Sequence, residues 1–258
     1  MVVFSLKGKF KLIILVVLLV AGVILAGNFF INDAKELVSM VTGGEAAKPI
    51  YKVDTEEKKV AISFDACWGA ERTDAILDIL DNNGVKATFF LVNIWLEDYP
   101  DKAKEIAERG HEIGLHSTTH PHFSRLSKEK MKEELYKNKE MVKETTGYDA
   151  VVFRPPFGDY NNEVIETAME LGLTTIQWSI DSLDWKENLS AQEISKRILD
   201  RIENGAIILM HNDGQYTPDV IKVVLPELKR QGYSVVPVSK LLIKGEYYVD
   251  SQGVQRKK

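Results

Sequence analysis

The chain has 258 residues, of which 45% are hydrophobic and 28% are charged. This composition is typical of globular proteins and excludes disordered, collagen-like and coiled-coil proteins. Three of the 33 basic residues fall in the first 31 positions, which leaves 30 basic against 38 acidic residues, a net charge of −8 with histidine neutral. We expect no nucleic-acid partner, because phosphate binding needs a basic surface. The single cysteine, Cys67, excludes an intramolecular disulfide and a zinc cage built from cysteines.

The amino terminus carries an apolar segment long enough to cross a membrane. Residues 12–26 contain no polar side chain, and apolar character resumes at residues 29–31. A helix over all 20 positions would be about 30 Å long, which matches a bilayer core. Lysines precede the segment and acidic residues follow it, so the positive-inside tendency predicts a membrane anchor at residues 1–31 with the following domain extracytoplasmic. A cleaved signal peptide, which would release a secreted domain, is the alternative, although Ile24 stands where its cleavage site needs a small residue.

The next segment, residues 32–57, is expected to be a linker, because glycines, Pro49 and many charges fall in its second half. Residues 58–243 are expected to form one domain. The tail, residues 244–258, is expected to be a solvated or loosely docked extension.

The predicted domain alternates short β-branched or aromatic runs with segments of helical period, as parallel βαβ units do. Helix signals fall between the strands, among them Ser190 with Glu193 as a capping box and Gly147 as a stop. Seven consecutive units favour an irregular, TIM-like (β/α)7 barrel over an open doubly wound sheet, which the pattern does not exclude. The predicted strands cover residues 60–64, 87–92, 112–116, 150–154, 174–180, 206–211 and 234–238.

Polar side chains stand at the carboxyl ends of five predicted strands. Parallel-sheet enzymes place their active sites at this end of the sheet, so we expect these side chains to converge. The five residues are Asp65, His116, Arg154, Asp181 and His211.

Histidines recur four residues apart at His116 and His120. This spacing places two imidazoles on one side of a helical turn, within reach of one divalent cation. Two histidines at this spacing, taken alone, are more often a surface or capping feature. Here the first of them stands at the end of a predicted strand, and this position favours metal binding. We assign structural roles to His111 and His122.

Together these residues carry a resemblance to a known family. The chain resembles the NodB-homology polysaccharide deacetylases, carbohydrate esterase family four, over about residues 58–243. The apolar amino terminus and the sequence FDACWG at residues 64–69 further resemble the PdaB-type sporulation deacetylases. Five motifs carry the family resemblance: Ser63-Phe64-Asp65, His116-Ser117-Thr118-Thr119-His120, Arg154-Pro155-Pro156-Phe157-Gly158, Asp181-Ser182-Leu183-Asp184-Trp185 and Ile207-Ile208-Leu209-Met210-His211.

The resemblance implies hydrolysis of an N-acetyl group on an amino sugar. It implies a divalent metal, zinc above all, bound by His116 and His120, which would polarise the amide carbonyl. Asp65 would be the general base, with Arg154 keeping its carboxylate ionised.

For the leaving amine the resemblance implies His211 as the general acid, because an amide anion is too basic to leave unprotonated. Asp181 would orient and charge this imidazole, with Asp184 as the alternative. The resemblance also implies an oxyanion contact from the backbone N–H of Phe157. Trp185 and Leu209 would line a slot for the acetyl methyl group, unless they are simply core residues.

The chain departs from the family pattern at Ala66. Family members usually have a second aspartate there, which completes an Asp-His-His metal site. Water or a carboxylate from Asp65, Glu71 or Asp74 would have to complete the shell here. A weak metal site would result unless another ligand helps.

The sequence therefore predicts a metal-dependent hydrolase that deacetylates extracytoplasmic cell-wall polysaccharide, with peptidoglycan as the expected substrate and sporulation as one setting. The alternative is a catalytically impaired homologue that binds glycan on the same rim. A glycosidase using Asp65 and Asp181 is a third reading, which leaves the paired histidines unexplained. The sequence carries no signal for an oligomeric state.

Overall fold

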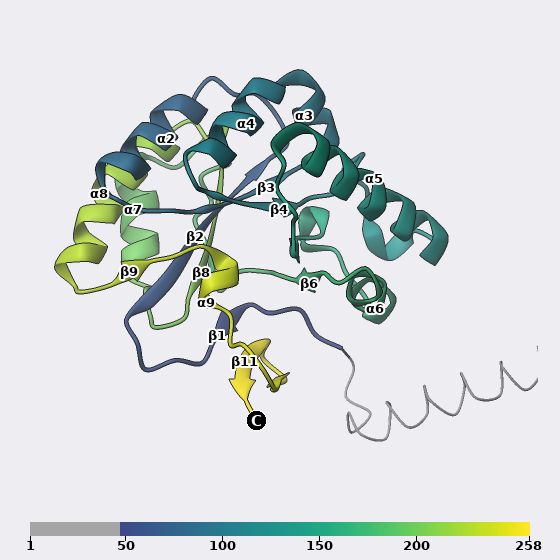
Figure 1. Cartoon of the computed structure of the whole chain (residues 1–258). Helices are drawn as coiled ribbons and strands as arrows, with labels where there is room; N and C mark the ends of the chain where they lie inside the picture. Colours follow the sequence, from purple (N-terminus) through teal and green to yellow (C-terminus); the bar gives the residue numbers. More distant parts are fainter. Residues whose placement is uncertain (1–46) are drawn as a thin grey trace, which may run out of the picture. The chain divides into compact units, whose positions relative to one another are not determined.

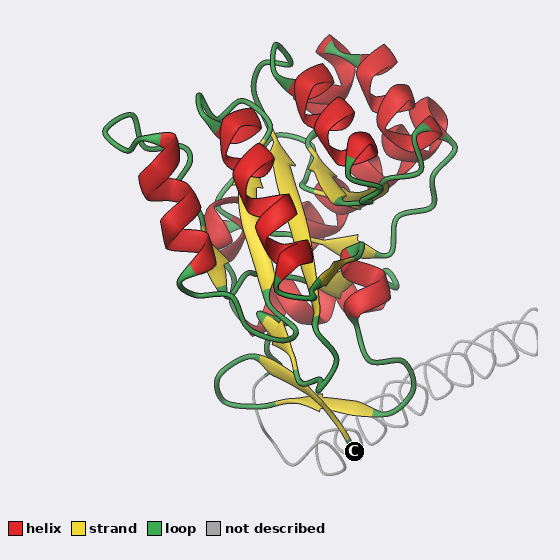
Figure 2. Ribbon diagram, turned by 90° about the vertical axis from the view of Figure 1, so that its left-hand side faces the viewer, coloured by secondary structure: helices red, strands yellow, loops and turns green. Residues whose placement is uncertain are grey.

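The apolar runs of the sequence form one curved sheet through the middle of the folded domain (Figures 1 and 2). This computed structural model describes residues 47–258. The strand order is β6-β5-β4-β3-β2-β8-β7, with β9 paired to the start of β2, and every one of these pairs is parallel. The predicted α/β class is confirmed, and the curled parallel sheet is consistent with a (β/α)7 barrel. The strands are β2 (Lys59–Ala66), β3 (Thr88–Leu91), β4 (Glu112–Leu115), β5 (Val152–Phe153), β6 (Thr174–Thr175), β7 (Ile180–Asp181), β8 (Ile207–His211) and β9 (Ser234–Val235).

Helices cover the outside of this sheet (Figure 1). The predicted capping signals are confirmed: Ser190 and Glu193 form a reciprocal capping box, and Gly147 ends its helix with a φ of 71°. The helices are α2 (Thr73–Asn82), α3 (Asn93–Asp98), α4 (Pro100–Glu108), α5 (Lys128–Thr146), α6 (Asn162–Glu170), α7 (Ala191–Leu199), α8 (Thr217–Arg230) and α9 (Val238–Leu241), with short 3-10 turns η1 (Phe123–Arg125) and η2 (Pro156–Gly158).

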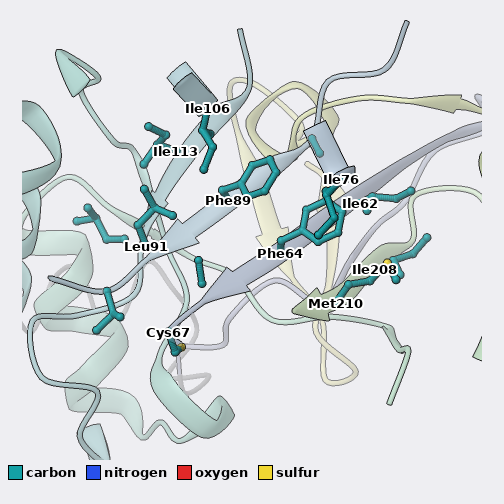
Figure 3. Close-up of a cluster of buried hydrophobic side chains, with 14 of the residues drawn as sticks. Ile62, Phe64, Cys67, Ile76, Phe89, Leu91, Ile106, Ile113, Ile208 and Met210 are labelled. Carbon is teal, nitrogen blue, oxygen red and sulfur yellow. The ribbon is translucent and has the colours of Figure 1, made fainter. Parts of the chain in front are cut away.

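Alternate residues of the same strands pack into two separate hydrophobic clusters, because successive side chains of a strand point to opposite faces. Phe89 and Ile208 belong to the large cluster between the sheet and its helices (Figure 3). Phe90 and Ile207 belong to a smaller cluster on the inner face of the curve. Both faces of the sheet are therefore buried, as expected for parallel strands.

The run at residues 174–180, predicted as one strand, is divided into β6 and β7. The two pieces pair with different neighbours, β5 and β8, at opposite ends of the strand order. Ile50 lies against the first piece: its N–H donates to the Thr175 carbonyl at 3.0 Å, and its carbonyl accepts from Gln177 at 2.8 Å. The N–H of Val53 donates to the Gly205 carbonyl at 3.0 Å beside the start of β8. Residues 50–53 thus connect the β6 edge of the curved sheet with the start of β8, the next-to-last strand at the other side.

The bounds expected for the linker and the tail need correction. Residues 47–258 form one compact unit, so the end of the expected linker and the whole tail belong to the folded domain. β1 (Lys52–Val53) pairs with β11 (Val254–Lys257), which also pairs with β10 (Tyr247–Val249). The side chain of Gln255 is buried and accepts from the N–H of Ile243 at 2.9 Å. Burial of Ile50 and Val53 supplies the apolar contacts that a solvated linker would lack.

Within residues 47–258, no helix is long and apolar enough to span a membrane. The membrane anchor predicted at residues 1–31 lies outside the described residues.

Candidate active site

The carboxyl ends of four strands bring the predicted polar residues together. Asp65 near the end of β2 pairs in register with His211 at the end of β8. His116 directly follows β4, and Arg154 directly follows β5. Since these strands are parallel neighbours or near neighbours, their ends share one rim of the sheet.

Asp65 and Arg154 form a buried ion pair at this rim. The guanidinium Nη1 lies 2.7 Å from Asp65 Oδ1, and Nη2 donates to Ser63 Oγ at 2.9 Å and to the Gln177 carbonyl at 3.2 Å. Arg154 is fully buried, with the ring of Phe90 4.2 Å from its guanidinium carbon. Burial by itself raises the pKa of Asp65, but the charge and hydrogen bond of Arg154, together with the neighbouring His116 and His211, outweigh burial and hold that pKa below its ordinary value. Asp65 is therefore an anion at neutral pH, as a general base must be.

His116 and His120 present neutral imidazoles beside this carboxylate. His116 Nδ1 lies 2.7 Å from the Arg154 carbonyl, so Nδ1 carries the proton, and Nε2 lies 3.5 Å from Asp65 Oδ2. The ring centroids of the two histidines are 5.1 Å apart. Burial lowers the pKa of His116, and burial together with His116 lowers the pKa of His120 to about 4. Neutral imidazoles are the form that ligates metals.

The loop that carries these histidines is held by two residues of α5 that sequence reasoning missed. Asn138 Oδ1 accepts from the backbone N–H groups of His116 and Ser117, both at 3.0 Å. Glu134, one helical turn earlier, accepts from Thr118 N at 3.0 Å and from Thr119 N at 2.8 Å. Glu134 and Asn138 are polar side chains on the buried face of an otherwise amphipathic helix, and this break in the pattern was the available signal.

Cys67 lies beside the two histidines. The Cys67 sulfur and one ring nitrogen from each of His116 and His120 all lie within 4.8 Å of one another, and this is the one such group of three found among residues 47–258. Neither Glu71 nor Asp74, the carboxylates expected to be able to complete the shell from outside the strand, belongs to this group, and Asp74 pairs with Lys102 instead. Ala66 is buried in the core and offers no donor. The donor set of one thiol and two neutral imidazoles suits a borderline-soft divalent cation such as zinc.

His211 is paired with Asp184 rather than with Asp181, which corrects the predicted partner. Asp184 Oδ1 lies 2.8 Å from His211 Nδ1, and its Oδ2 accepts from His211 N at 2.8 Å and from Thr217 Oγ1 at 2.6 Å. Burial of His211 is the largest single influence and opposes its positive charge, but the hydrogen bond and charge of Asp184, together with the charges of Asp65 and Asp213, outweigh burial and raise the pKa of His211 to about 9. Asp181 Oδ1 instead accepts from Leu183 N at 2.9 Å. Asp181 therefore shapes the turn that brings Asp184 to the histidine.

Exposed aromatic side chains border the histidines. Phe157 has a φ of 60° and is 61% exposed, and its ring lies 4.5 Å from that of His120 and 4.4 Å from that of His122. Trp68 is 58% exposed and lies edge-on to His120, with ring centroids 6.3 Å apart. Trp185, next to Asp184, is 56% exposed. Large exposed aromatic rings at a polar rim are typical of a binding surface.

Two further predicted residues lie as follows. Leu209 is buried in β8, two residues before His211. His111 is buried directly before β4, at the end of that strand opposite the rim, with Nδ1 accepting from Ala87 N at 3.2 Å and the Phe89 ring 5.5 Å away. This packing fits the structural role predicted for His111.

Comparison with known proteins identifies the family. The family model for polysaccharide deacetylase matches residues 52–176. The chain is 34% identical over 197 residues to a peptidoglycan-N-acetylglucosamine deacetylase of Bacillus cereus, covering 74% of this chain and 92% of that relative. The chain belongs to the polysaccharide deacetylase family. The resemblance read from the five motifs is thereby confirmed at the level of the family.

Other relatives differ in length and in activity. The chain is 36% identical over 195 residues to the uncharacterized protein YlxY of Bacillus subtilis, covering 76% of this chain but 60% of YlxY. It thus spans less than two thirds of that relative. The crystal structure of BA3943 from Bacillus anthracis, described as a CE4 family pseudoenzyme, superimposes with a TM-score of 0.73 at 34% identity, covering 76% of this chain and 69% of that one. The family therefore includes both deacetylases and pseudoenzymes among similar chains.

Proposed function

We propose that this protein is a metal-dependent N-deacetylase that acts on amino sugars of extracytoplasmic cell-wall polysaccharide, with peptidoglycan as the expected substrate. The observation that carries the proposal is the register pairing of Asp65 with His211, each with a partner of opposite charge. One rim thus presents an anionic base and a cationic acid side by side. Amide hydrolysis needs both, because water must lose a proton while nitrogen gains one.

The residues divide the work as follows. Asp65, kept ionised by Arg154, takes a proton from the attacking water. His211, kept protonated by Asp184, delivers a proton to the departing nitrogen. The backbone N–H of Phe157 is the proposed donor to the oxyanion, and Trp185 and Leu209 are the proposed walls of the acetyl slot.

His116 and His120 would hold the metal, and zinc is the expected ion. When bound, the ion supplies Lewis-acid polarisation of the acetyl carbonyl. The buried ion pair of Asp65 with Arg154 holds the base in place beside His116.

Relatives named peptidoglycan deacetylases support the choice of polymer. The apolar segment at residues 12–26 supports an extracytoplasmic site of action, either anchored or released. A role in sporulation stays a prediction, which rests on the resemblance of the apolar amino terminus and of residues 64–69 to sporulation deacetylases.

Release of acetate tests the proposal. The full chain is incubated with peptidoglycan and with chitooligosaccharides, with zinc or cobalt added, and acetate is quantified. We expect release that falls by at least about 100-fold in Asp65→Asn, the usual effect of losing a general base, while Lys137→Ala on the exposed face of α5 keeps full activity.

A glycan-binding homologue without catalysis is the second candidate. Ala66 favours it, as does the similarity to a chain described as a pseudoenzyme. Binding of the same glycans with no acetate from any substrate or metal supports this second function and contradicts the first.

A further inference from the structure

The structure assigns Cys67 as the third protein ligand of the metal, in place of the carboxylate that Ala66 cannot supply. This inference rests on the proposed metal-dependent function and deepens it. It also leaves Asp65 free to act as the base, since Asp65 does not have to turn toward the ion.

Position favours Cys67 over other donors. Cys67 directly follows strand β2 and lies at the carboxyl end of that strand, beyond the labelled core residue Phe64 (Figure 3). It is 8% exposed, so little water competes for the ligand position. The carboxylate of Asp65 is engaged by Arg154 at 2.7 Å, and Asp74 pairs with Lys102. Among the described residues, the thiol is the donor that joins the two imidazoles in one group, with all three donor atoms within 4.8 Å of one another.

Spacing and orientation fit a tetrahedral ion. Zinc with sulfur and nitrogen ligands at ordinary bond lengths places the donor atoms roughly 3.3 to 3.6 Å apart. The three donor atoms here lie within 4.8 Å of one another, so displacements on the order of 1 Å would bring them to that spacing. His116 is already oriented, because its Nδ1–H donates a hydrogen bond to the Arg154 carbonyl. Nε2, which carries no proton, is thereby left as the atom that can bind the metal. A histidine whose second nitrogen bonds a backbone carbonyl is the usual arrangement at metal sites.

The backbone around Cys67 is held firmly, which favours a preformed site. Asn212 N donates to the Asp65 carbonyl at 3.3 Å, and Asn212 Nδ2 donates to the Gly69 carbonyl at 2.8 Å. Trp95 Nε1 donates to the same carbonyl at 2.6 Å. These bonds fix the chain on both sides of Cys67.

A sulfur ligand predicts metal preference. Thiolate selects zinc, cobalt(II) and cadmium over magnesium and calcium, which prefer oxygen ligands. Binding would convert the thiol to a metal thiolate with release of one proton to solvent, so no oxidant or reductant is needed.

Cobalt(II) spectroscopy tests the assignment without any activity assay. The full chain, purified in detergent because residues 12–26 are apolar, is freed of metal and titrated with cobalt(II). We expect one equivalent to bind with a thiolate-to-cobalt charge-transfer band in the near ultraviolet. Cys67→Ser should lose that band and should weaken zinc binding by at least about 100-fold. Loss of a residue that only hydrogen-bonds a metal ligand already costs up to about 100-fold, and a direct ligand should cost no less. His122→Ala, outside the cluster, should keep the band.

The outcomes separate this inference from the proposed function. Cobalt binding without the band, or with a band that survives in Cys67→Ser, overturns the ligand assignment even if acetate is released. The band with no acetate release from any substrate supports the assignment and contradicts the deacetylase. Absence of cobalt and zinc binding overturns the assignment, and circular dichroism of each variant shows whether its fold is intact.

Discussion

The pairing of His211 with Asp184 makes a quantitative prediction about the general acid. Folding raises the pKa of His211 from 6.5 to about 9, because Asp184, which bonds the imidazolium at 2.8 Å, acts with the charges of Asp65 and Asp213 to outweigh the cost of burial. A difference of this size corresponds to about 3 kcal/mol of interaction with the charged form. Because folding raises this pKa, the stabilisation is fully present below pH 6.5 and is lost as the pH rises through about 9.

Asp184→Asn removes the charge while keeping the shape of the side chain. We expect the pKa of His211 to fall to its ordinary value or below, because burial is the largest single influence and only the charges of Asp65 and Asp213 then oppose it. At pH about 7.5 the protonated fraction would drop about tenfold, from nearly all molecules to no more than about a tenth. The alkaline limb of the profile of deacetylation rate against pH should move to lower pH together with the pKa of His211.

Histidine titration by NMR measures this directly in metal-free protein, with His211→Gln to assign the signal. The matched control is Asp181→Asn, since Asp181 bonds Leu183 and not His211. The reasoning is refuted if His211 of the unmodified chain titrates at or below 6.5, or if Asp181→Asn lowers its pKa as much as Asp184→Asn does.

Three further predictions concern the scaffold of the site. Replacing Arg154 by Met leaves the Asp65 carboxylate buried without its partner and should lower the unfolding free energy at neutral pH by about 3 to 5 kcal/mol; urea titration measures this, and a loss below about 1 kcal/mol would contradict the role of the ion pair. Replacing Asn138 by Ala leaves the backbone N–H groups of His116 and Ser117 without their acceptor and should lower the free energy of unfolding by at least about 2 kcal/mol. Lys137→Ala on the same helix should change that free energy by no more than about 0.5 kcal/mol. Equal losses in the two variants would show that the hydrogen bonds to Asn138 contribute little. Removing residues 246–258 breaks the hydrogen bonds that the Gly253 and Gln255 carbonyls accept from the backbone N–H groups of Tyr51 and Asp54, and two that join the Gln255 side chain to Ile243. Each should contribute about 1 kcal/mol to the free energy of unfolding. An unchanged thermal unfolding temperature would mean that the tail is not part of the domain.

The sequence by itself determined the repeating architecture and the rim. Period-two and period-3.6 patterns are local properties, so the positions of most strands, the capping box at Ser190 and the convergence of Asp65, His116, Arg154 and His211 followed from them. Parallel strands have their carboxyl ends on one side, and this rule alone placed those side chains together.

Tertiary structure decided what periodicity does not encode. The turn between Asp181 and Asp184 contains Leu183 at a φ of 61°, a loop conformation that no pattern signals, and it selects which carboxylate reaches His211. Cys67 and Ala66 are adjacent in the sequence, yet only the path of the chain after β2 shows that the sulfur lies beside the histidines while the methyl group is in the core. The division of residues 174–180 and the pairing of β1 with β11 depend on partners about 125 and 200 residues away in the chain, because a strand takes its place from the edge that is free to pair with it.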